Sequence, residues 1–519
     1  MNRKRRILDN LHGLIYLTEL EYKLVQTKHF QRLRHIKQLG VAELVFPGAS
    51  HTRFSHSLGV LELTDKIYSM LSKHSSNYPN LERDRRVMRV AALLHDIGHY
   101  PLSHTLEAAY QKFYDYENEG SSKEDESEVN GNHKDLSKYF TKTKKVKQNE
   151  ANIKDPMNHE ELSKFIIEQN VDIFNILKNE LDTYDIQDIK RSIIGAETVS
   201  QPYLIQLLHS DLDADNLDYC LRDSHGAGIQ YGKYDINYLL DNVRLFEKDS
   251  SFVLCFKERA IHTIEHFLLA RHFYYLQILY HKRRLFFEEA AKRFAIESIK
   301  IGWLPKPSQY RTIISTQQGL KFTDHFFGSL CHKAYNNQKY SFNEKSPCSS
   351  TDKMKIFAKI LIEAISLPSN RIYSNKIIQE LPSCLRFNHL RDYNEFKDKR
   401  DNFYNNLKEQ AVGIQTMKSK FLFDEYRFED NEILTNTFGR FYSKFSVTKT
   451  LSEYKFEKFD PKSDKPYIPT DDEFLYESRD PIRIIDKDGN ISFLSEDKSS
   501  LAYMLARNKI GVYTHFFSE

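Results

Sequence analysis

The chain has 519 residues, of which 40% are hydrophobic and 28% are charged, and its formal net charge is +3. This balance is typical of a folded globular protein and excludes a disordered chain, and no apolar run is long enough to span a bilayer. The near-neutral charge leaves nucleic acid as a possible but unsupported partner. The cysteines form no CxxC pair, so we expect reduced thiols, a cytoplasmic protein and no membrane partner.

The amino-terminal part of the chain is mostly helical in its pattern. Apolar side chains recur at i, i+3, i+4 and i+7 in Val87, Val90, Ala91 and Leu94. This spacing predicts a helix with one buried face. Gly98 is expected to end that helix, because glycine is common just beyond a helix end.

A break in composition follows this helical part. Residues 116–132 are acidic and rich in Ser, Gly and Asn, whereas residues 134–147 are rich in lysine. Neither stretch has apolar periodicity. We therefore predict that residues 116–155 are a charged flexible insert, either a plain solvated loop or a lid.

Helical patterning resumes at His159 and leads into a predicted hairpin. Alternating residues from Val243 to Phe256 favour two short strands. An aromatic-rich stretch from about Glu258 to Ile299 is then predicted to be a long helical stretch. Phe273 and Tyr274 in this stretch are expected in the core.

The carboxy-terminal part mixes helices and strands. Pro305 and Pro307 mark its beginning, and a second hairpin is expected in residues 482–494. The predicted fold class is therefore mainly α, with a helical core, small β-hairpins and an α+β carboxy-terminal region.

Chemistry is indicated by an adjacent histidine and aspartate, His95 and Asp96, at the end of the first predicted helix. One imidazole and one carboxylate side by side suit a divalent metal of intermediate hardness. His56 and Asp215, far away in the sequence, would complete such a site and leave coordination positions for water and phosphate. The pair alone is a weak signal, because the chain has 21 histidines.

The surroundings of this pair strengthen the signal. His95, His99 and His104 fall within ten residues, and His159 opens the next helical run. Histidines that cluster so tightly indicate a polar pocket.

A second run, residues 215–223, is as informative. If it is helical, Asp215, Tyr219 and Asp223 share one face, which suits a metal, a sugar ring and a sugar hydroxyl. Asp218 and Arg222 form a separate i, i+4 pair, whose expected role is to brace the helix.

Together these motifs resemble the HD-domain superfamily and, within it, the dNTP triphosphohydrolases of mammals and bacteria. The similarity covers roughly residues 9–300 apart from the insert, and its main runs are FPGASH (46–51), RFSHSLG (53–59), HDIGHYPLSH (95–104) and DNLDYCLRD (215–223). It implies an HD phosphohydrolase core in residues 1–115 and 156–300. Residues 301–519 would then serve regulation and oligomerisation.

The resemblance also implies roles for individual residues. It implies that a divalent metal (Mg, Mn, Fe or Zn) is bound by His56, His95, Asp96 and Asp215. It implies that the attacking water and the α-phosphate are held by His99, Glu107 and His159, and that the general acid near the 5′ oxygen is His104. It implies that the deoxyribose is contacted by Gln38, Leu39, Tyr219 and Asp223, and the phosphates by Arg53 and Arg271.

The sequence departs from the family at several of these places. Glu107 replaces an aspartate, and Asn216 stands where the mammalian enzyme has a phosphate-binding lysine. Leu279 replaces an aromatic residue that helps to exclude ribose. Gln31 and Arg34 are retained, so the resemblance implies an allosteric site for a nucleotide activator or inhibitor, and a homotetramer.

Three functions are open at this point. The first is hydrolysis of deoxynucleoside triphosphates to deoxynucleoside and triphosphate. The alternatives are an HD phosphohydrolase with another nucleotide substrate, and a nucleotide-sensing effector without turnover. The missing lysine at Asn216 favours the last of these, whereas the complete set of metal-binding side chains argues against it.

Overall fold

The computed structural model describes residues 5–121, 157–363, 374–381, 482–494 and 510–515. Short gaps within the first two ranges are residues 75–77, 79, 197–198, 249–250, 280 and 344–345. Within these ranges, no helix combines the length and the apolarity needed to cross a bilayer. The four cysteines in the described part of the chain are free thiols.

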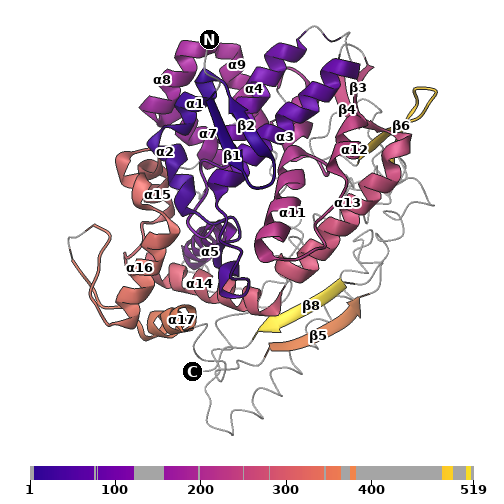
Figure 1. Ribbon diagram of the computed structural model, residues 1–519. Coiled ribbons are helices and arrows are strands. Elements are labelled where there is room, and N and C mark those ends of the chain that lie inside the picture. Colours follow the sequence, from indigo (N-terminus) through magenta and orange to yellow (C-terminus); the bar gives the residue numbers. More distant parts are fainter. Residues whose placement is uncertain are drawn as a thin grey trace, which may run out of the picture.

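Helices make up most of the described chain, so the predicted mainly α class is confirmed (Figure 1). The amino-terminal elements are β1 (Arg5–Asp9), β2 (Gly13–Leu17), α1 (Glu19–Val25), α2 (Lys28–Arg32), α3 (Arg53–His74), α4 (Leu81–Leu94) and α5 (His104–Ser121). The central elements are α7 (His159–Gln169), α8 (Val171–Glu180), α9 (Thr183–Ile193), α10 (Pro202–His209), α11 (Ala214–Ala227), α12 (Ile236–Asp241), β3 (Val243–Lys248), β4 (Ser251–Lys257), α13 (Ile261–Tyr274) and α14 (Lys282–Lys300). The remaining elements are α15 (Pro307–Ile314), α16 (Asp324–Tyr335), α17 (Asp352–Ile362), β5 (Ser374–Leu381), β6 (Arg483–Ile485), β7 (Ile491–Phe493) and β8 (Ile510–His515).

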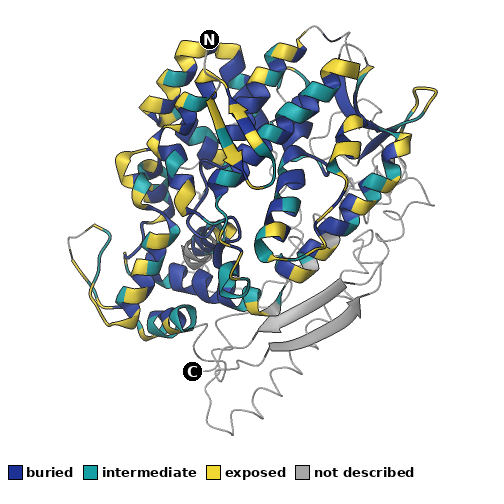
Figure 2. Cartoon of the chain, in the orientation of Figure 1, coloured by how far each residue is buried: buried dark blue, intermediate teal, exposed yellow. Residues whose placement is uncertain are grey.

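Helix α3 lies at the centre, packed against α4 and α11 (Figure 1). Its buried residues lie on all sides, as expected of a helix with neighbours on every face. Helix α4 has the predicted buried face, which includes Val87 and Leu94. By contrast, outer helices such as α8 expose most of their residues (Figure 2).

Both predicted hairpins are present, and they meet in one sheet. β3 and β4 pair antiparallel, with Val243 opposite Phe256. β6 adds to the other edge of β4 in parallel, with Phe256 opposite Ile484, and β7 follows β6. The sheet order is therefore β3-β4-β6-β7, and a carboxy-terminal segment completes a sheet of the central part.

The predicted helical stretch after the first hairpin is present in three pieces: α13 ends at Tyr274, a π-helical turn occupies Tyr275–Leu279, and α14 begins at Lys282. Two local predictions, for Phe273 and Gly98, were wrong. Phe273 is 38% exposed, whereas Tyr274 is buried, because the two side chains point about 100° apart around α13 and only Tyr274 faces the core.

Gly98 does not end α4 either, since that helix ends at Leu94. A Cβ atom at Gly98 would lie 2.3 Å from the backbone nitrogen of Ser163 in α7. The glycine is therefore needed for the close approach of α7, not for a helix cap.

The predicted insert, residues 116–155, lies mostly outside the described residues, and α5 continues to Ser121. Residues beyond position 301, such as Trp303 and Phe357, belong to the same hydrophobic cluster as the central helices. The boundaries of the three predicted regions stay predictions.

The contact between α3 and α11 gives a first testable prediction. A Cβ atom at Gly59 would lie 1.9 Å from Oδ1 of Asp218 and 2.5 Å from Nη2 of Arg222, both buried. We expect Gly59→Ala to lower the free energy of unfolding by about 1–3 kcal/mol through overpacking. Thermal and urea unfolding measure this change.

Gly328→Ala in α16 is the matched control, because its Cβ atom would meet no atom within 4 Å. Removing a helical glycine there should stabilise the protein by about 0.5–1 kcal/mol. Equal effects of the two substitutions would contradict the packing argument.

Candidate active site

The end of α4 places the first two candidate ligands. His95 caps this helix, and its Nδ1 lies 2.7 Å from the carbonyl oxygen of Ala92. A carbonyl can only accept, so Nδ1 carries the hydrogen and Nε2 keeps a free lone pair. Asp96, which is 1% exposed, follows directly.

The other two candidate ligands, His56 and Asp215, lie on helices α3 and α11. Nδ1 of His56 lies 2.7 Å from Oδ2 of Asp218, which again leaves Nε2 with a lone pair. This Nε2 lies 2.8 Å from Oδ1 of Asp215, in the first turn of α11. It lies 3.8 Å from Oδ2 of Asp96.

These four side chains fit a divalent metal. Nε2 of His95 lies 3.4 Å from Oδ1 of Asp96 and 3.9 Å from Oδ1 of Asp215. Ligand atoms held by one ion at about 2.0–2.2 Å lie about 3–3.5 Å apart, close to the separations seen here. The Nε2 atom of His95 is buried without a hydrogen-bond partner, and that of His56 faces the carboxylates of Asp215 and Asp96. A cation between these groups would satisfy both nitrogen lone pairs.

The charges around His56 also favour a cation at this place. Burial lowers the pKa of His56, but hydrogen bonds and charges from Asp215 and Asp218 outweigh burial and raise it to about 10. Burial raises the pKa of Asp215, while His56 and His95 bring it down to about 2. The negative potential that stabilises a proton on His56 equally suits a divalent cation at the same place.

Asp218 has a role that the sequence reasoning missed. The expected ion pair with Arg222 is present, with Nε 2.7 Å from Oδ2. The same carboxylate also accepts from Nδ1 of His56 and, at 2.6 Å, from Nε2 of His12. No local pattern could reveal these partners, because they lie in distant parts of the chain.

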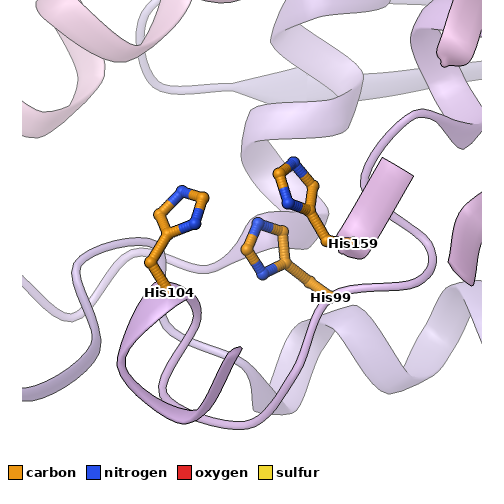
Figure 3. Close-up of side chains that lie close together, drawn as sticks. All are labelled: His99, His104 and His159. Carbon is orange, nitrogen blue, oxygen red and sulfur yellow. The ribbon is translucent and has the colours of Figure 1, made fainter. Parts of the chain in front are cut away.

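Beside this group lies an imidazole cluster, which we define as His99, His104 and His159 (Figure 3). The rings of His99 and His159 are stacked, with centroids 4.2 Å apart and planes 19° apart. The His104 ring stands nearly perpendicular to both. Glu107 accepts from Nδ1 of His104 at 3.0 Å and from Nδ1 of His159 at 3.2 Å.

The stacking makes this cluster a poor second metal site. An imidazole lone pair lies in the plane of its ring, so a bound ion lies in that plane. One ion cannot lie in two nearly parallel planes that are separated by a stacking distance.

The pKa values of the two stacked rings, His99 and His159, are shifted in opposite directions. Burial lowers the pKa of His99, which is therefore neutral. Burial also lowers the pKa of His159, but the charge and hydrogen bond of Glu107 raise it to about 9. A cationic ring thus lies on a neutral one, and His99 Nε2 is 3.6 Å from Oδ1 of Asp96.

The arginines that were expected at phosphates are anchored within the protein. Arg53 donates to Oδ2 of Asp96 at 2.7 Å, to Oγ of Ser103 at 3.0 Å and to the carbonyl oxygen of Gln38 at 3.3 Å. Arg271 donates to the carbonyl oxygen of Asp211 at 3.2 Å. Arg53 is therefore next to the metal ligands, and it links them to Gln38.

The residues expected at the sugar are also held in place. Tyr219 donates to Oδ1 of Asn216 at 2.7 Å. Both oxygens of Asp223 accept, one from His51 at 2.7 Å and the other from Tyr274 at 2.6 Å. On the other side, Leu39 is buried, and Oε1 of buried Gln38 has no hydrogen-bond partner.

The two tentative allosteric residues lie together on the surface side. Arg34 donates to Oε1 of Gln31 at 2.7 Å, and Gln31 donates to the carbonyl oxygen of Val25 at the same distance. The Arg34 guanidinium lies 3.5 Å from the centre of the Phe54 ring. Phe54 directly follows Arg53 in α3, so this contact lies next to the candidate site.

Known proteins are similar to this chain over about half of its length. An uncharacterized protein of Methanocaldococcus jannaschii, MJ1154, is 32% identical over 294 residues, which cover 57% of this chain and 50% of that protein. Deoxynucleoside triphosphate triphosphohydrolase SAMHD1 of Homo sapiens is 30% identical over 272 residues, covering 49% and 38%. The chain thus spans about half or less of the length of these curated relatives.

A crystal structure of a hypothetical protein from Aquifex aeolicus has the same fold. It superposes with a TM-score of 0.55 at 20% identity and covers 99% of this chain and 96% of its own. The HD domain family matches residues 53–220, which include His56, the His95–Asp96 pair and Asp215. HD domains bind divalent metals. Residues 53–220 of this chain therefore match the HD domain family, and all four candidate metal ligands lie within this range.

Proposed function

We propose that the chain hydrolyses deoxynucleoside triphosphates to deoxynucleoside and triphosphate. The observation that carries this proposal is the convergence of two histidines and two aspartates from α3, α4 and α11 beside the imidazole cluster. The similarity to SAMHD1, whose name states this activity, supports the substrate class.

In this proposal the metal is held by His56, His95, Asp96 and Asp215. A metal bound there acidifies a water molecule and polarises the phosphate. Asp218 keeps the His56 ring turned toward the site, because it binds the nitrogen on the opposite side of the ring. Arg53 offsets the charge of Asp96.

The imidazole cluster would serve the phosphate and the leaving group. Cationic His159 suits the α-phosphate, and neutral His99 would help to position the attacking water. His104 would act at the 5′ oxygen through Nε2, since Glu107 occupies its Nδ1. Burial lowers the pKa of His104, so this ring must take up a proton before it can donate one. Glu107 then stabilises the imidazolium, as a carboxylate does in a catalytic triad.

On the substrate side, the fixed hydrogen bonds favour a defined pocket. Gln38 offers an unpartnered buried oxygen for a sugar hydroxyl, with Leu39 beside it. Tyr219 and Asp223 would close the other side of the sugar. Arg53 and Arg271 would meet the phosphates from their anchored positions.

Nucleotide regulation through Gln31 and Arg34, assembly into homotetramers and a cytoplasmic location stay predictions. The carboxy-terminal region, residues 301–519, would contribute to regulation and assembly.

Product analysis tests the proposed reaction. Purified protein is incubated with dNTPs and NTPs in the presence of Mg, Mn or Fe, and the products are separated by chromatography. We expect intact triphosphate and deoxynucleoside, and Asp96→Ala should lower the rate by at least about a thousandfold because the metal site is lost. Asp241→Ala, at a surface aspartate paired with Arg259, is the control. Release of monophosphate, or nucleotide binding without turnover, would instead favour one of the alternative functions.

Asp218 gives a prediction about metal affinity that needs no turnover. Asp218→Asn keeps the shape of the side chain but removes the charge that holds the Nδ1–H of His56. We expect the affinity for Mn, measured by calorimetry, to fall about 10–100-fold. The control Asp241→Asn should leave the affinity for Mn unchanged. An unchanged affinity in Asp218→Asn would show that Asp218 does not orient His56 for the metal.

The His159–Glu107 pair gives a prediction about pH. The pKa of His159 is raised from 6.5 to about 9, so the pair stabilises the fold fully below pH 6.5 and loses this effect as pH rises to about 9. The difference in melting temperature between wild type and His159→Gln should therefore be largest near pH 6 and shrink toward pH 9.

His262→Gln is the matched control. His262 also faces a glutamate, Glu265, but its side chain is 95% exposed. Its effect on the melting temperature should be small at every pH. A His159→Gln effect that does not change with pH would contradict the assignment of charge.

A further inference from the structure

The backbone just before His104 has an unusual conformation. Leu102 and Ser103 have φ angles of 54° and 56°, in the left-handed region that residues with a Cβ atom avoid. His104 then begins α5. Something must hold this turn, because two consecutive residues are unlikely to adopt the region without support from their surroundings.

The support comes from Asp324, the first residue of α16. Its Oδ1 accepts from the backbone nitrogen of Leu102 at 2.7 Å, and its Oδ2 accepts from the backbone nitrogen of Lys37 at 2.9 Å. One carboxylate thus joins the turn before His104 to the segment before Gln38.

Further contacts fasten these two segments to each other. Oγ of Ser103 donates to the carbonyl oxygen of Lys37 at 2.7 Å, and Arg53 donates to the same Oγ. A Cβ atom at Gly40 would lie 2.7 Å from the carbonyl oxygen of Leu102, so the segments are in direct contact. A shift of one segment would therefore move the other.

A second set of contacts, made by Arg32, joins the residues next to Asp324 to the loop between Asp96 and His104. Buried Arg32 donates to the carbonyl oxygen of Phe322 at 2.8 Å, and also to those of Ile97 and His99 at 3.0 and 2.8 Å. Residues 322–324 are thus linked to both halves of the loop between Asp96 and His104. These residues lie outside the matched HD domain, which covers residues 53–220.

We propose that Asp324 is a positioning residue, which sets the place of His104 and of Gln38 by fixing the left-handed turn at Leu102 and Ser103. This inference rests on the proposed function for its catalytic consequence. Both oxygens of Asp324 are used by backbone groups of the loop and of the Gln38 segment, so it acts through them and not on the substrate.

Asp324→Asn tests the proposal. The amide has one acceptor, and its NH2 group would face a backbone N–H in place of the second. We expect kcat to fall about 10–100-fold through misplacement of His104 and KM to rise through misplacement of Gln38, while the affinity for Mn changes less than about threefold. Asp352→Asn is the matched control, because Asp352 is the first residue of α17 and is exposed.

A second substitution separates positioning from general damage. Glycine adopts the left-handed region freely, so Leu102→Gly should make the turn less dependent on the carboxylate. We expect Asp324→Asn to lower kcat less in the Leu102→Gly background than in wild type. If the single variant does not fold, the double variant is compared with Leu102→Gly alone. Equal losses in both backgrounds would overturn the proposal.

Hydrogen exchange decides the matter without turnover. Asp324→Asn should speed exchange in the peptide around Leu102, and Asp352→Asn should not. If wild type released no triphosphate, the proposed function would fail. The exchange result would still show whether Asp324 holds the turn at Leu102. Unchanged exchange around Leu102 would overturn this role of Asp324 even in an active enzyme.

Discussion

The site depends on one buried carboxylate between two helices. Asp218 of α11 binds His56 of α3 on one side and Arg222 on the other, and His12 reaches it from the amino-terminal hairpin. The contact is possible only because position 59 has no side chain. It fixes the distance between α3 and α11, and so the separation of His56 and Asp215, the two candidate metal ligands that these helices carry.

The candidate site has two parts that differ in charge. Carboxylates surround His56 and create a place for a cation, whereas the imidazole cluster shares a single carboxylate, Glu107. The two parts meet where Oδ1 of Asp96 lies 3.6 Å from Nε2 of His99. Charge that develops on a phosphate would therefore meet a cation on one side and proton donors on the other.

The sequence predicts the parts of this arrangement that follow local patterns. The face of α4, the helical run from Asp215 and both hairpins follow from periodicity and turn residues. The break after Tyr274 and the true reason for Gly98 depend on tertiary packing, which periodicity does not contain. The same holds for Asp218 and Asp324, whose partners lie far away in the chain. Resemblance supplied candidate roles for the site residues, but not the contacts that orient them.

The four-stranded sheet has a consequence for biosynthesis. During synthesis on the ribosome, β4 can pair at first only with β3. Its other edge stays unpaired until β6 is made, after residues 258–481. An open strand edge of this kind can pair with another nascent chain. Closure of this sheet is therefore a long-range step that cannot occur until most of the chain has been synthesised.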